Sequence, residues 1–64
     1  MKTRQLINNR TGKLIYLTVS GNFLIASTGT KDKLRTSEKE FENYDEACKA
    51  FIKRELEAIK KGYN

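Results

Sequence analysis

The sequence has no histidine, no tryptophan and no proline, and Cys48 is its only cysteine. A chain with one cysteine cannot form an intramolecular disulfide, and a zinc site would lack its usual ligand types. We therefore expect no metal site and no cofactor. Stability must come from packing alone or from a partner, because domains of this size often need such support.

No stretch of the chain approaches the roughly 20 apolar residues of a membrane span. The N-terminal residues 1–5 are not followed by the apolar segment of a signal peptide. A single cysteine also suits a reducing compartment. These features predict a soluble, cytoplasmic protein, and its 64 residues predict a single domain.

Positive charge is concentrated in the first half of the chain. The net charge is +5. Residues 1–35 carry seven basic side chains against Asp32 alone, whereas residues 36–64 carry six basic and seven acidic ones. Basic patches attract phosphate polymers, although a charge of this size also suits a merely soluble surface.

Four short strands precede one helix in the predicted organisation. The strands are expected at Arg4–Asn8, Lys13–Ser20, Phe23–Ser27 and Leu34–Phe41. Gly12 and Gly21 lie in the first two turns, and residues 28–33 are expected to form a loop. Leu34 and Phe41 are seven residues apart, so they cannot share one face of a regular strand. We expect the strand to end before Phe41, which would be the first contact beneath the helix.

Ile15, Leu17 and Val19 alternate along the second strand and are expected to form its core face. The helix is expected at about residues 44–61, with Asn43 as N-cap, Glu46 as its capping-box partner and Gly62 as the C-terminal stop. Its predicted apolar stripe has helical spacing. The stripe comprises Tyr44, Ala47, Cys48, Phe51, Ile52 and Ile59, with Leu56 near it. The predicted fold is α+β: a four-stranded antiparallel meander sheet packed by one C-terminal helix.

The C-terminal segment contains a recognisable block, which consists of Phe41–Ala47, then Phe51, then Lys60-Lys61-Gly62-Tyr63. This block resembles the C-terminal half of a WGR domain, and Lys13–Leu17 with Gly21-Asn22 resembles that family's second strand and turn. The named Trp-Gly-Arg triplet falls on Thr28-Gly29-Thr30, and only the glycine matches. The chain therefore resembles a degenerate WGR domain, in which the downstream glycines are also missing and a one-residue gap is needed to align Phe41.

The resemblance implies a compact antiparallel sheet packed by one long helix. WGR domains occur in poly(ADP-ribose) polymerases, where they contact DNA ends and neighbouring domains, and in bacterial regulator-like proteins of uncertain function. The roles of the family's Trp and Arg cannot pass to Thr28 and Thr30, because threonine has neither a ring nor a fixed charge.

Enzymatic chemistry is poorly supported, and we expect no catalytic residues. Cys48 lies on the predicted apolar stripe without a histidine to activate it. The carboxylates at the end of the fourth strand and the start of the helix are explained by capping and solvation. A nucleotide site at Thr28–Lys31 is a third and weaker hypothesis, because one glycine does not make a phosphate cradle.

The best candidate site is a set of basic and hydroxyl side chains for nucleic-acid phosphates. Its members are Thr28, Thr30, Lys31, Lys33, Arg35, Arg10 and Lys13. The leading function is a nucleic-acid-associated or regulatory binding module with weak electrostatic contacts. The alternative is a protein-protein interaction or scaffolding domain without nucleic-acid binding. The ending at Gly62-Tyr63-Asn64, where WGR domains stop, also leads us to expect the N-terminal piece of a longer chain.

Overall fold

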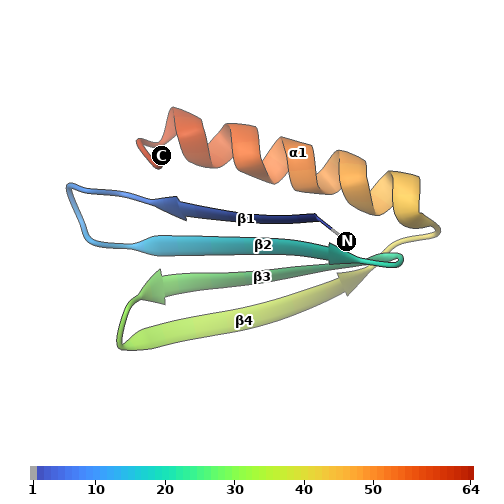
Figure 1. The fold of residues 1–64 in the computed structure, drawn as a ribbon, viewed down its shortest axis with the longest axis horizontal. Coiled ribbons are helices and arrows are strands. Elements are labelled where there is room, and N and C mark those ends of the chain that lie inside the picture. Colours follow the sequence, from blue (N-terminus) through green and yellow to red (C-terminus); the bar gives the residue numbers. More distant parts are fainter. Residues whose placement is uncertain (1) are drawn as a thin grey trace.

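A computed structural model describes residues 2–64 of the chain. The strands are β1 (Lys2–Ile7), β2 (Leu14–Ser20), β3 (Phe23–Thr30) and β4 (Lys33–Glu40), and the helix is α1 (Tyr44–Lys60). The strands pair antiparallel in the order β1-β2-β3-β4, and α1 lies across one side of the sheet (Figure 1). The predicted α+β fold is confirmed.

The predicted bounds of β1 and β3 differ most from the structure, and β2 and β4 each begin one residue away from the prediction. β1 begins at Lys2 and ends at Ile7, so Asn8 belongs to the turn. β3 does not stop at Ser27 but continues through Thr28-Gly29-Thr30, which was expected to be loop. Only Lys31 and Asp32 separate β3 from β4, since Thr30 pairs with Lys33. Cross-strand hydrogen bonds and the tight turn therefore extend β3 through Thr30, although the polar residues at its end do not favour a strand.

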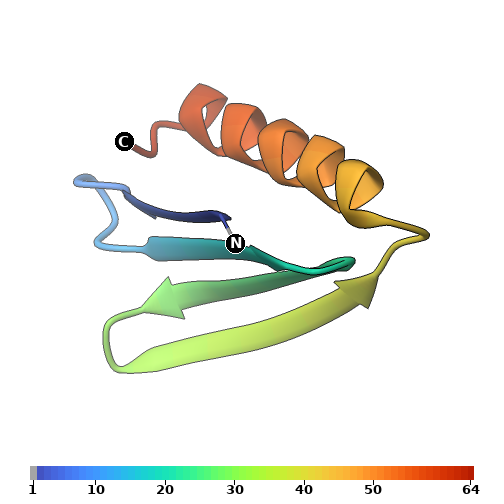
Figure 2. The ribbon, with the colours of Figure 1, turned by 45° about the vertical axis from the view of Figure 1, so that its right-hand side comes forward.

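The core lies between the helix and one face of the sheet. Leu17 and Val19 on β2 are fully buried, and Ile15 packs against the same cluster, which confirms the predicted core face. Leu24 and Ala26 on β3 complete the sheet side of the core. The other face of the sheet is left open, as Figure 2 shows. An antiparallel sheet can expose one face in this way.

The buried face of α1 differs from the predicted stripe. Ala47 and Phe51 are buried as expected, and Ala58 joins them. Three residues of the predicted stripe instead remain exposed, namely Tyr44, Ile52 and Ile59, as does Leu56 beside it. The reason is that α1 has more apolar residues than one sheet face can cover. Ala47, Phe51 and Ala58 face the sheet, and the remaining apolar side chains lie on a neighbouring flank of the helix.

Both ends of α1 are fixed by specific hydrogen bonds. The Asn43 Oδ1 accepts the Glu46 N–H at 2.9 Å, which confirms the predicted N-cap. At the other end Gly62 has φ +100°, the left-handed geometry expected of a helix stop. The last residue, Asn64, then exchanges two backbone hydrogen bonds of 2.8 Å with Ile7, so the C-terminus returns to β1.

The connection before the helix is held by the turn between β2 and β3. The Phe41 N–H donates to the Asn22 carbonyl at 2.7 Å, and the Asn22 side-chain amide donates to the Phe41 carbonyl at 2.8 Å. β4 ends at Glu40, and Phe41 packs against the core, as expected. No helix within residues 2–64 is long and apolar enough to cross a membrane.

Candidate nucleic-acid interface

The strand register sorts the charges of the sheet onto opposite faces. Side chains paired across strands point to the same face. On β4, Arg35 pairs with Thr28 and Lys39 pairs with the buried Leu24, so both cations project on the helix side. All five basic residues of the strands follow this rule: Lys2, Arg4, Lys33, Arg35 and Lys39. Within the described residues 2–64, the acidic residues of the strands are Glu38 and Glu40, and both project on the open face.

Four of the seven predicted site residues meet at one pocket, which we call the Tyr63 pocket. It has a volume of about 340 Å³. Its lining residues are Lys13, Thr28, Gly29, Lys33, Leu34, Arg35 and Tyr63. Lys13 precedes β2, whereas Lys33 and Arg35 belong to β4. Lys13 and the basic residues of β4 are about 20 residues apart in sequence. They nevertheless line the same pocket from either side of β3.

The other predicted site residues lie outside this pocket. Thr30 ends β3, and Lys31 lies in the two-residue turn that follows. Arg10 lies in the first turn, where its backbone N–H donates to Asn8 Oδ1 at 2.9 Å. Thr30, Lys31 and Arg10 are all exposed. Lys31 lies in the turn between β3 and β4, whereas Lys33 begins β4 and pairs with Thr30.

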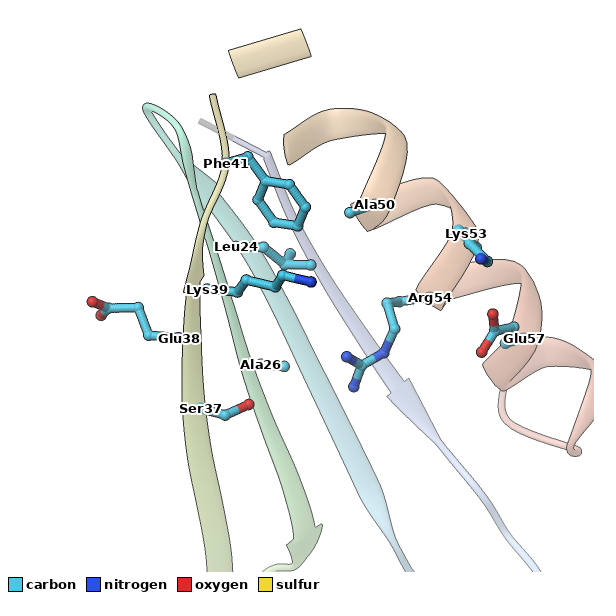
Figure 3. A pocket seen from close by; sticks show the side chains of 10 residues that line it. All are labelled: Leu24, Ala26, Ser37, Glu38, Lys39, Phe41, Ala50, Lys53, Arg54 and Glu57. Atoms are coloured by element: carbon cyan, nitrogen blue, oxygen red, sulfur yellow. The ribbon is translucent and has the colours of Figure 1, made fainter. Parts of the chain in front are cut away.

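A second depression, the β4–α1 groove, lies along the helix side of β4. It has a volume of about 610 Å³ (Figure 3). Its floor is apolar and contains Leu24, Ala26, Phe41 and Ala50. Its charged lining residues are Lys39, Lys53, Arg54, Glu38 and Glu57. In Figure 3 the Glu38 side chain points away from the groove, as its register requires.

The cations of the two depressions have no carboxylate partner among the described residues. The ion pairs within residues 2–64 are Arg4 with Glu55 at 3.3 Å and Lys49 with Glu46 at 3.6 Å. Lys39 instead places its Nζ 5.3 Å from the centre of the Phe41 ring. Unpaired cations keep their charge available for an external anion, because no internal ion pair has to be broken first.

Sequence reasoning missed the groove cations Lys39, Lys53 and Arg54. The signal for Lys39 was present in the alternation of β4, where it follows Lys33 and Arg35 at even spacing. Lys53 and Arg54 belong to α1, far from β4 in sequence, so no local pattern places them beside that strand. Only the angle at which α1 crosses the sheet brings them beside β4.

The groups that could support catalysis are scattered. Cys48 is half-buried, and the sequence has no histidine to activate it. The pKa of Tyr44 is raised, with a side-chain hydrogen bond to Cys48 as the largest cause. Glu38 and Glu40 lie on the open face, away from the acidic residues that start α1. Within residues 2–64, no three His, Cys, Asp or Glu side chains gather as metal ligands would.

Comparison of the chain with protein-family models, curated proteins and solved structures finds no match.

Proposed function

We propose that this domain is a small, non-enzymatic nucleic-acid-associated or regulatory binding module, similar to a degenerate WGR domain. Its helix side would contact the phosphate backbone with little sequence preference. One observation carries the proposal: every basic side chain of the sheet projects on the helix side, and both acidic ones project on the opposite face. A surface whose charges served only solubility would not require basic and acidic side chains to lie on opposite faces of the sheet.

The Tyr63 pocket supplies the chemistry that phosphate binding needs. Lys13, Lys33 and Arg35 provide three positive charges, and Thr28 provides a hydroxyl donor. The Arg35 guanidinium can hold two phosphate oxygens at once, whereas lysine acts as a point charge. These contacts would recognise phosphates and leave the base edges unread.

The β4–α1 groove extends the same cationic side. Along β4, Lys33 and Arg35 belong to the Tyr63 pocket and Lys39 belongs to the groove. Alternate residues of a strand are roughly 7 Å apart, so the strand offers cations at repeated intervals. Lys53 and Arg54 lie across the groove on α1. A phosphate backbone lying along β4 would therefore meet positive charge on both sides.

The salt dependence of binding tests this function. Fluorescence anisotropy with labelled duplex, nicked and single-stranded DNA at two salt concentrations should show binding that weakens steeply as salt rises. The slope of log K against log salt should be about −0.9 for each phosphate contacted on a duplex. The double variant Lys33→Ala/Arg35→Ala should weaken binding and make the slope less steep by about 2.

Lys49→Ala is the matched control, since Lys49 is paired with Glu46 on the outer surface of α1. It removes one positive charge without touching either depression, so its effect should be small. Absence of binding at low salt would contradict the function. If Lys49→Ala and the single variant Lys33→Ala lose the same affinity for DNA, only the net charge of the domain matters. That result would contradict the proposed site.

The uncharged part of the open sheet face favours the alternative, a protein-interaction or scaffolding domain. Tyr16 and Ile25 are half-buried and, by the strand register, project on the face opposite the buried Leu17 and Leu24. In Figure 2 no helix or strand lies over this face of the sheet. No basic side chain of the strands projects on this face. This alternative predicts that the same DNA titrations are flat at every salt concentration, so one experiment separates the two functions.

A further inference from the structure

The helix α1 exposes an apolar stripe that this chain does not cover. Tyr44, Ile52, Leu56 and Ile59 are 41%, 46%, 55% and 45% exposed. Ile52, Leu56 and Ile59 follow one another at spacings of four and three residues, so they form one continuous strip on the helix surface. Single exposed apolar residues are common, but an aligned set on one helix flank indicates an interaction surface.

The stripe lies on the flank of α1 that is remote from the proposed DNA site. Ala50, Lys53 and Glu57 mark the flank that faces the β4–α1 groove. The opposite flank faces β1, as the ion pair between Arg4 and Glu55 shows. On a helical projection, Ile52 and Ile59 fall on the β1 flank. A partner could therefore occupy this stripe while both depressions stay open.

The charges at the two ends of α1 indicate which partner would fit. Asp45 and Glu46 lie in the first turn, and Lys60 and Lys61 lie at the last turn and C-cap. A second copy packed antiparallel would bring the acidic end of each helix beside the basic end of the other. The two helix dipoles would also point in opposite directions, which places the positive end of each helix beside the negative end of the other. A parallel arrangement would place like charges together.

We propose that the stripe is a homodimer interface in which the α1 helices of two copies pack antiparallel about a two-fold axis near Ile52. A two-fold axis makes each contact occur twice, so a short stripe suffices to bury a double set of side chains. The Ile52 side chains of the two copies would meet at the axis, and each Leu56 would lie over Cys48 of the other copy. Each copy would present its cationic side outward. This inference is independent of the DNA-binding proposal.

Sedimentation equilibrium of the wild-type protein tests the interface. The weight-average mass should rise from the monomer value of 7.4 kDa towards twice that value as concentration increases. Ile52→Glu should weaken dimerisation more than about tenfold, because it places two carboxylates together at the axis. Lys53→Ala, on the groove flank, should leave the dimer unchanged. Circular dichroism confirms that each variant is folded.

Disulfide trapping supplies a second, structural test. In a Cys48→Ser background, Ile52→Cys should form a disulfide-linked dimer under mild oxidation, because facing Cα atoms at a helix contact approach within the roughly 4–7 Å that a disulfide spans. Lys53→Cys in the same background should not cross-link efficiently. A monomeric mass at all concentrations would overturn the proposal. So would equal cross-linking at residues 52 and 53.

Discussion

The carbonyl oxygen of Lys33 lies where a side chain on Gly29 would begin. Gly29 has φ +138°, and a Cβ built there would overlap the Lys33 carbonyl. The two residues lie on either side of the turn between β3 and β4, where Gly29 pairs with Leu34. The glycine of the Thr28-Gly29-Thr30 triplet therefore has a backbone reason to be there, apart from any role in binding.

Gly29→Ala should lower the free energy of unfolding by about 3 kcal/mol, because it adds backbone strain to the overlap with Lys33. Gly12→Ala is the matched control. Gly12 also has positive φ, at +75°, but a Cβ there meets no atom within 4 Å, so the loss should be about 1 kcal/mol. Urea denaturation measures both. If Gly29→Ala and Gly12→Ala lower the free energy of unfolding equally, the overlap with the Lys33 carbonyl is relieved without a cost in stability.

Asn8→Ala should destabilise the protein by about 1–3 kcal/mol. Asn8 is buried, and its Oδ1 accepts the backbone N–H groups of Arg10 at 2.9 Å and Thr11 at 3.3 Å. Its side-chain amide donates to the Lys61 carbonyl at 3.5 Å, linking the first turn to the end of α1. Urea denaturation should show little change for Asn9→Ala, whose side chain is exposed. A similar loss in both variants would contradict this role.

The pKa of Tyr44 is raised above 10.0, chiefly by its side-chain hydrogen bond with Cys48. Because the folded state holds the phenolic proton of Tyr44 more tightly than the unfolded state, this proton stabilises the fold below about pH 10. The contribution is lost as pH rises through the raised pKa of Tyr44. Ultraviolet absorbance should show one late-titrating tyrosine. Cys48→Ala should bring that titration back towards 10.0, whereas Tyr44→Phe should remove it. An unchanged titration in Cys48→Ala would exclude the hydrogen bond as the cause.

The elements with strong local signals were predictable from sequence. Asn43 followed by Glu46 identified the start of α1, and Gly62 identified its end, because capping depends on residues that are adjacent in the chain. The core face of β2 followed from alternation alone. By contrast, Thr28-Gly29-Thr30 looked like a loop, since the hydrogen bonds that make it a strand come from β2 and β4. Pairing between strands overrode local propensity there.

The candidate site was only partly predictable for a similar reason. The basic character of residues 31–35 was visible in the sequence, but the convergence of Lys13 with Lys33 depends on the register of three strands. The exposed apolar residues of α1 were misassigned because Ile52 and Ala47 are both apolar and both fit a helical period. That period does not show which of them faces the sheet. The orientation of α1 is a property of the packed fold.

A chemical-shift perturbation map with a short DNA reports both whether the domain binds nucleic acid and where. Shifts are expected at Lys13, Thr28, Lys33 and Arg35 on the helix side, and they should shrink as salt is added. Tyr16, on the open face, should be unaffected. Shifts centred on the open face, or no shifts at low salt, would contradict the proposal that the cationic side binds nucleic acid.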